Sequence, residues 1–165
     1  MTIGSLKDVY IDQLQDLYSA CNQSHPVTEA LANAAKNEDL KSALKAGAEG
    51  IQNGMAIAKE IVSAHGEDAT EEFCKGMEGL VKEARAHSLE ADFSDQDAQD
   101  AMIITQYQRM VHYALAGWGC TVAFAKRLGL KEDAAKLQKC LDKTYDGDRR
   151  MTKIAEIDVN ADAVS

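Results

Sequence analysis

The sequence has few aromatic residues and a single proline, and this shortage argues against β-structure. Aromatic residues make up 5% of the chain, whereas hydrophobic residues of all kinds make up 45%. Helices packed through Ala, Leu, Ile and Met have this composition, while strands are richer in Val, Tyr and Thr. A chain of 165 residues is also close to the usual size of one domain with one substantial core. We therefore expect an all-α protein in which residues 1–165 form a single helical domain.

The chain is also short of basic residues and of long apolar runs. It contains 27 acidic and 18 basic residues, for a formal net charge of -9, and such a surface repels phosphate backbones and anionic lipid headgroups. No segment approaches the roughly 20 apolar residues that span a bilayer, and the first residues lack the cationic and apolar parts of a leader peptide. The sequence therefore predicts a cytoplasmic protein that binds neither nucleic acid nor membranes.

The four cysteines lack the close pairs that a zinc knuckle requires. Cys21, Cys74, Cys120 and Cys140 are widely spaced, and each lies on or beside an apolar helical stripe. In a cytoplasmic protein this pattern favours buried, reduced thiols. A disulfide or a redox role is the alternative interpretation.

Apolar residues recur at steps of three and four along most of the chain, which predicts helices. The first helix extends from about Leu6 to Ala34. Pro26 interrupts it, because proline lacks an N–H donor and clashes with the preceding turn. We therefore expect a kink or a stop near residues 22–25, with Ser24 capping the restart.

The next two helices are bounded by caps and glycines. The second helix is predicted between a cap at Asn37 and a stop at Gly66. A shorter helix fits residues 70–91, with Thr70 as its cap and Phe73 on its apolar side. The segment SLEADFSDQDAQD is then the longer connection to the following helix.

The last two helices cover most of the remaining chain. Ser94 is predicted to cap the fourth helix, which ends at Gly129, and the last helix begins near Lys131. We expect a frayed tail after about residue 158.

Two glycines weaken the fourth helix beside its tryptophan. Gly117 and Gly119 flank Trp118, and each destabilises a helix by roughly 1 kcal/mol relative to alanine. We expect a neighbouring helix or ring to approach closely there.

Four long helices, each roughly 40 Å long at 1.5 Å per residue, with a short extra helix, are typical of a ferritin-like bundle. The segments LKDVYIDQLQDLYSA, GMEGLVKEA, HYALAGWG and LGLKEDAAKLQKCL occur in an order and spacing that resembles the YciE/YciF family of ferritin-like bacterial stress proteins. The resemblance is collinear over residues 5–155. It implies a four-helix bundle with a short accessory helix, a homodimer, a link to stress responses, and a di-metal site of ill-defined activity.

Most ligands of that di-metal site are absent from this sequence. A di-iron bundle uses one Glu from each of two helices and a Glu-x-x-His pair from each of the other two. By the resemblance, the ligand positions hold Cys21 in the first helix, Glu49 and Gln52 in the second, Val111 and Ala114 in the fourth, and Thr144 and Asp148 in the last. Only Glu49 and Asp148 keep a carboxylate. We therefore predict a degraded di-metal site and no bound cofactor.

Nearby residues suggest an alternative metal site. A single iron or another divalent ion could be held by residues near the inward helix faces: Asp16, Glu49, His112, Asp142 and Asp148. The protein would then be a metal-dependent oxidase of the ferroxidase type. Without a metal, His112 should pair with a carboxylate, and Asp148 should accept a hydrogen bond from one of Tyr10, Tyr18, Tyr107 or Gln52.

Other routes to catalysis find no support in the sequence. It contains no glycine-rich phosphate loop, no nucleophile elbow, and no cysteine at a helix N-terminus with a partnered histidine. We therefore favour a non-enzymatic stress protein whose bundle is an interaction or assembly module, with the oxidase as the alternative. The resemblance, together with the apolar residues around Trp118 and the short helix, leads us to expect a homodimer.

Overall fold

Four long helices and one shorter helix make up most of the computed structural model, which describes residues 3–164. The long helices are α1 (Leu6–Ala34), α2 (Glu38–Ala64), α4 (Gln96–Arg127) and α5 (Lys131–Ile154), and the shorter one is α3 (Lys75–Ser88). A π-helical turn at Ala155–Val159 and the one-turn helix α6 (Asn160–Asp162) follow α5. The described residues contain no strand. The predicted all-α bundle of four long helices with a short accessory helix is confirmed.

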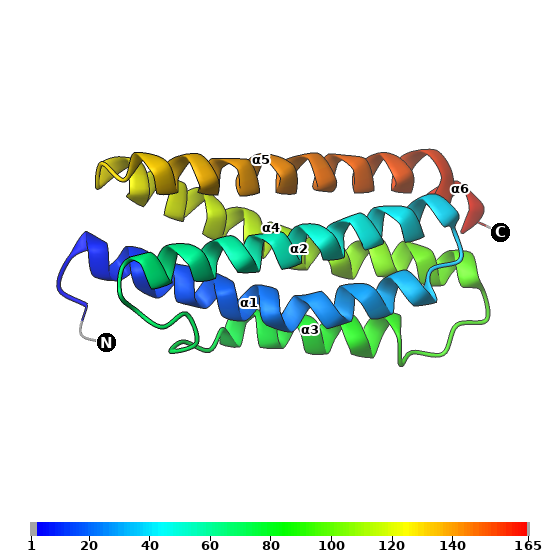
Figure 1. Cartoon of the computed structure of the whole chain (residues 1–165). Helices are drawn as coiled ribbons and strands as arrows, with labels where there is room; N and C mark the ends of the chain where they lie inside the picture. The colour runs from blue at the N-terminus through cyan, green and yellow to red at the C-terminus, as the bar shows by residue number, and fades with distance from the viewer. Residues whose placement is uncertain (1–2, 165) are drawn as a thin grey trace.

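The four long helices lie side by side, and α3 lies along one side of the bundle (Figure 1). α1 and α5 each pack against both α2 and α4, so α2 and α4 occupy opposite corners of the bundle. α3 packs into the groove between α1 and α4. This arrangement makes the space between α2 and α4 the centre of the bundle.

Several predicted helix ends are confirmed. The Asn37 side chain accepts hydrogen bonds from the N–H groups of Asp39 and Leu40, both at 3.0 Å, and so caps α2. Gly66 and Gly129 follow α2 and α4 with φ angles of 83° and 75°. This left-handed conformation suits glycine and ends a helix.

The sequence predicted a kink or a stop in the first helix just before Pro26, and the predicted stop is wrong. α1 continues through Pro26, and Ser24 does not cap a restart, because its hydroxyl donates to the Cys21 carbonyl at 3.4 Å. Proline removes only one hydrogen bond from the helix. Val27 and Leu31, both fully buried, anchor the segment after the proline in the core, and this burial outweighs the missing bond.

The predicted starts of the third and fourth helices are also wrong. α3 is capped by Cys74 rather than Thr70, and Phe73 lies outside it with 53% of its surface exposed. α4 is capped by Asp95, one residue later than the predicted Ser94. Thr70 instead belongs to a turn, in which its N–H group donates to Asp68 Oδ1 at 2.9 Å, and the Asp95 side chain accepts from the N–H group of Asp97 at 3.0 Å.

The C-terminal segment is helical for longer than predicted. The chain forms the π-helical turn and α6 up to Asp162, instead of fraying after about residue 158. Val159 explains the difference, because it is only 2% exposed and belongs to the core.

A buried carboxylate fastens the turn between α1 and α2 to α4. Asp100 is 1% exposed, and its two carboxylate oxygens accept hydrogen bonds from the backbone N–H groups of Lys36 at 2.9 Å and Asn37 at 2.7 Å. Nearby, the Lys36 ammonium group forms an ion pair with Asp97 at 2.8 Å. The sequence did not reveal the role of Asp100, because the carboxylate acts on a turn more than sixty residues away in the chain.

Candidate functional site

Glu49 and Gln52, two positions of the expected ligand set, point away from the bundle interior. Both side chains are exposed on α2, whereas Leu44 and Ala48 are buried. Each helical residue is turned by about 100° from the one before it, so the buried stripe through Ala48 directs Glu49 outward. Glu49 lines a surface hollow of about 410 Å³ that also contains Lys45. The prediction that Glu49 lies near an inward face is wrong.

His112 and Asp148 lie together across α4 and α5. The His112 Nε2 atom is 3.2 Å from Asp148 Oδ1, and Gln108 Nε2 donates to the same oxygen at 3.2 Å. The imidazole side chain is 64% exposed, whereas the carboxylate side chain is 18% exposed. The predicted pairing of His112 with a carboxylate is confirmed. The predicted partners of Asp148, a tyrosine or Gln52, are wrong.

Asp16 belongs to a different cluster from His112 and Asp148. Its carboxylate accepts a hydrogen bond from the Tyr113 hydroxyl at 2.9 Å, and the same hydroxyl lies 2.9 Å from the Cys74 sulfur. Burial, and then hydrogen bonding to Cys74 and Asp16, raises the pKa of Tyr113. Asp142 joins neither cluster, since it is exposed and accepts a hydrogen bond from Gln138 at 2.9 Å.

Two aromatic rings fill the centre of the bundle where a di-metal site would lie. Both extend from α4 to glycines on α2, the helix at the opposite corner. The Tyr107 hydroxyl occupies the position that a Cβ atom at Gly47 would take, and Trp118 Cζ2 would lie 3.0 Å from a Cβ atom at Gly54. Tyr107 and Trp118 are 5% and 3% exposed. Burial, together with the nearby charge of Asp148, raises the pKa of Tyr107 to about 12.

The glycines beside Trp118 have different environments. A Cβ atom at Gly117 would lie 2.5 Å from Leu17 Cδ2, which confirms the predicted close approach of a neighbouring helix. A Cβ atom at Gly119 would meet nothing within 4 Å, so the prediction is wrong there. Because Trp118 is buried, its surroundings do not supply the exposed apolar surface on which the expected homodimer was partly based.

Apolar or neutral side chains stand at the other expected ligand positions. Cys21 is 5% exposed and Val111 is 8% exposed. Burial raises the pKa of the Cys21 thiol to about 12, so the thiol is neutral at physiological pH. Of the four cysteines, Cys21, Cys74 and Cys140 are buried, but Cys120 is exposed, contrary to the prediction that all four thiols are buried.

The residues present do not fit a di-metal centre. Residues 3–164 contain no group of three or more His, Cys, Asp and Glu side chains that could hold a metal ion. Carboxylates from all four helices must converge to offset the repulsion between two cations. Here Glu49 points outward and Asp16 is bonded to Tyr113. Among the expected ligand residues, only His112 and Asp148 lie close together.

A polar cluster that sequence reasoning missed joins three helices at one end of the bundle. Asp133 Oδ2 accepts a hydrogen bond from the Tyr10 hydroxyl at 3.1 Å and lies 2.9 Å from His65 Nε2. The Tyr10 and His65 rings also meet edge to face, with their centroids 5.9 Å apart. The topology of the bundle is the signal that could have revealed this cluster, since the start of α1, the end of α2 and the start of α5 meet at the same end.

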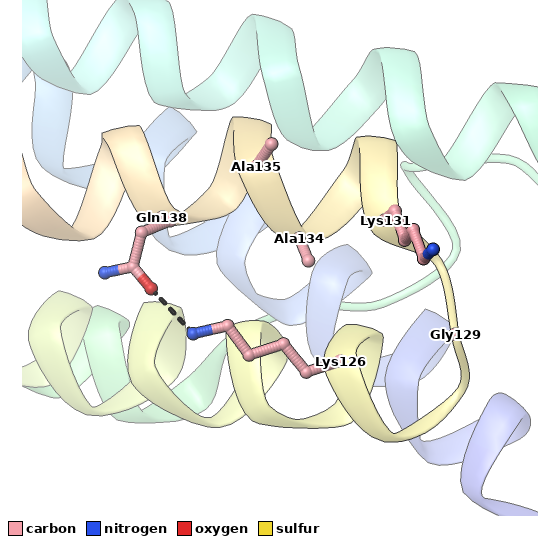
Figure 2. A pocket seen from close by; sticks show the side chains of 6 residues that line it. All are labelled: Lys126, Gly129, Lys131, Ala134, Ala135 and Gln138. Carbon is pink, nitrogen blue, oxygen red and sulfur yellow. Dashed lines mark hydrogen bonds between the residues drawn. The ribbon is translucent and has the colours of Figure 1, made fainter.

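A hollow lies between the end of α4 and the start of α5 (Figure 2). Its volume is about 400 Å³, and its lining includes Lys126, Lys131, Ala134 and Gln138. Lys126 Nζ donates a hydrogen bond to Gln138 Oε1 at 3.0 Å, and Figure 2 shows this bond across the opening. The lining contains no carboxylate, histidine or cysteine, so the amines of Lys126 and Lys131 are its only titratable groups.

None of the helices within residues 3–164 has both the length and the apolar character needed to cross a bilayer. The expected lack of a membrane partner is consistent with this finding and stays a prediction.

Known proteins resemble this chain over nearly its whole length. Protein YciF of Escherichia coli strain K12 is 29% identical over 164 residues, which cover 99% of this chain and 98% of that protein. The crystal structure of the E. coli stress protein YciF matches with a TM-score of 0.88 and 28% identity, over 96% of this chain and 99% of that one. YcfI of Rhodopseudomonas palustris, for which a structural role is suggested, matches with a TM-score of 0.85 and 25% identity, over 93% and 96% of the two chains.

A family model agrees with these similarities. The model described as a domain of unknown function, DUF892, matches residues 5–164. The predicted resemblance to the YciE/YciF proteins is thereby confirmed. The chain is a member of the DUF892 family and a full-length homologue of the stress protein YciF.

Proposed function

We propose that this protein acts in bacterial stress responses as a metal-free helical module for protein interaction or assembly, in the cytoplasm and as a homodimer. The observation that carries the proposal is the filled bundle centre. Tyr107 and Trp118 extend across it to Gly47 and Gly54, and these rings occupy the space that metal-binding carboxylates need. A buried apolar centre stabilises the bundle itself, which suits a structural role rather than catalysis.

Exposed apolar side chains support the assembly part of the proposal. Ile157 and Val164 are 71% and 83% exposed within one short C-terminal segment, and exposed apolar side chains that lie near one another are candidates for contact with another chain. The suggested structural role of YcfI points in the same direction. Sedimentation at micromolar concentration should give a particle of about twice 17.9 kDa. A single species of 17.9 kDa would contradict the homodimer.

Metal analysis tests the metal-free part of the proposal. Protein expressed in iron-supplemented medium should contain far less than one iron or manganese per chain. Its melting temperature should not change when Fe(II) or Zn(II) is added, because only ligands that bind the folded state raise its stability. Near-stoichiometric metal, together with a large rise in melting temperature, would overturn this part.

The alternative function is a metal-dependent oxidase that uses a single ion, and one observation favours it. His112 and Asp148 are 3.2 Å apart on neighbouring helices. If metal raises the melting temperature, His112→Ala should abolish the rise. His87→Ala is the matched control, since His87 is 3.2 Å from Glu83 and is also exposed. A rise that His112→Ala removes and His87→Ala leaves intact would favour the oxidase.

A further inference from the structure

Basic side chains form a line along the side of α5 that faces α2. Their spacing of three, four and seven residues places them on one side of the helix, and we call them the basic strip: Lys136, Lys139, Lys143 and Arg150. Both ends of the strip contact α2. Lys136 Nζ pairs with Glu60 at 2.8 Å, and Arg150 Nη2 lies 3.5 Å from Ser42 Oγ. The two middle lysines are exposed and form no ion pair within residues 3–164.

The basic strip runs against the charge of the whole chain. The sequence has 27 acidic and 18 basic residues, whereas α5 has five acidic and seven basic ones. Four of the five acidic side chains of α5 already bond to other residues: Asp133 to Tyr10, Asp142 to Gln138, Asp146 to Arg149 and Asp148 to Gln108. The fifth, Glu132, lies one turn before the strip. The two middle lysines therefore keep their charge available to an acidic partner.

Small residues leave a furrow beside the basic strip. Gly50 lies about two turns after Ser42, and Gly147 lies about one turn before Arg150, so both glycines face the seam between α2 and α5. A Cβ atom at either glycine would meet nothing within 4 Å. The hollow of about 410 Å³ on α2 reaches the same seam, since Ser42 lines it together with two acidic and two basic residues. The furrow therefore has room for a side chain from another molecule, and its positive charge comes from the strip.

The connection between α2 and α3 has the opposite charge. Residues 67–73, which we call the acidic segment, contain no basic residue and four exposed acidic ones: Glu67, Asp68, Glu71 and Glu72. Phe73 at the end of this segment is 53% exposed. Ala69 and Cys74, which are 1% and 0% exposed, hold the backbone of the segment against the core. The acidic segment therefore presents four carboxylates and one aromatic ring to solvent in a fixed arrangement.

We propose that the acidic segment of one copy docks on the basic strip of a second copy of this chain, and that a two-fold axis repeats the contact. The contact rests on the proposed homodimer and assigns the surfaces that form it. A net charge of -9 makes most pairings of two copies repulsive, so a contact between opposite charges is selected. Phe73 lies over the furrow at Gly50 and Gly147, where no side chain blocks it.

Two charge-reversal variants test this contact. Lys139→Glu with Lys143→Glu makes the strip negative, and Glu67→Lys with Glu72→Lys makes the segment positive. Sedimentation at micromolar concentration should show that each variant alone associates at least about tenfold more weakly than the unmodified protein, because like charges then meet at both contacts. An equimolar mixture of the two variants should form a dimer as tight as that of the unmodified protein, since opposite charges meet again at both contacts. A mixture that stays monomeric would overturn the proposal.

A matched variant controls for the change in net charge. Lys82→Glu with Arg85→Glu, at two exposed positions of α3, changes the net charge by the same amount as the strip variant. It should associate like the unmodified protein. Equal weakening in this control and in the strip variant would show that general repulsion separates the copies, and the assigned surfaces would then be wrong.

Two further measurements use the rest of the contact. Raising the salt concentration from about 0.1 M to about 1 M should weaken the dimer of the unmodified protein at least about tenfold, because it shortens the screening length from about 10 Å to about 3 Å. Phe73→Ala should weaken the dimer by a similar factor, since a buried aromatic ring is a common anchor of an interface. A dimer that is insensitive to both changes would contradict the proposal.

The same experiments separate a failure of this contact from a failure of the homodimer. A dimer that persists in the strip variant but dissociates on Ile157→Ser would be formed by the exposed C-terminal segment. The assigned surfaces would then be wrong, while the homodimer would stand. An unmodified protein that remains at 17.9 kDa in low salt would overturn the homodimer itself.

Discussion

Replacing Asp100 by alanine removes the buried carboxylate that fastens the α1–α2 turn to α4. The two oxygens accept hydrogen bonds from the backbone of Lys36 and Asn37 at 2.9 and 2.7 Å. Each hydrogen bond to a charged group contributes about 1.5 to 3 kcal/mol, and its loss leaves a donor without a partner. We therefore expect Asp100→Ala to lower the free energy of unfolding by about 3 to 5 kcal/mol. That is a large part of the stability of a typical domain.

Urea denaturation measures this loss, and two further variants sharpen the test. Asp97→Ala is the matched control, because Asp97 lies in the first turn of the same helix and contacts Lys36 through a partly exposed ion pair. Such pairs contribute at most about 1 kcal/mol. Asp100→Asn keeps one acceptor oxygen and should cost about half as much as Asp100→Ala. If Asp100→Ala costs no more than Asp97→Ala, the two backbone bonds do not hold the turn and the reasoning fails.

Three other predictions concern the bundle centre. Gly47→Ala should lower the free energy of unfolding by about 1 to 3 kcal/mol, because its methyl group would overlap the Tyr107 hydroxyl. Gly50→Ala, with nothing within 4 Å, should raise it by about 0.5 to 1 kcal/mol, and urea midpoints compare the two. Cys21→Glu and Val111→Glu should each cost about 1 to 3 kcal/mol at neutral pH, since each buries a carboxylate without a cation. A gain in stability from either substitution would contradict the apolar centre. Finally, the Cys21 thiol has a pKa of about 12 when folded, above its ordinary 9.0. The unfolded chain therefore loses this proton first above pH 9, and stability falls as the pH rises toward 12. Cys21→Ala should reduce the loss between pH 8 and pH 10 by about 1.4 kcal/mol.

The bundle was predictable from the sequence because its signals are local and repeated. Apolar residues at helical spacing, the cap at Asn37 and the glycines at positions 66 and 129 placed both ends of α2 and the C-terminal end of α4 correctly. Pro26 misled the prediction because the loss of one hydrogen bond is visible in the sequence, whereas the burial of Val27 is decided only by the neighbouring helices.

The candidate site was less predictable, because it depends on the rotation of each helix and on contacts between distant residues. Glu49 was placed inward by the family resemblance, but the buried stripe through Ala48 turns it outward. The pairing of His112 with a carboxylate was predicted, yet the partners of Asp148 were not, since Gln108 lies one turn before His112 on the exposed side of α4. That none of these residues binds metal stays a prediction.

The aromatic rings that end on glycines make pairs of positions interdependent. A larger residue at position 47 is tolerated only if the ring at position 107 becomes shorter, and a larger residue at position 54 requires the ring at position 118 to shift by a few tenths of an ångström. Enlarging the glycine alone, or shortening the ring alone, lowers the free energy of unfolding, whereas making both changes together does not. The effects of the two substitutions are therefore not additive. Among homologues, the glycine and the aromatic residue of each pair should therefore vary together. A designer who wishes to introduce carboxylates at the bundle centre therefore has to change residues on α2 and on α4 together.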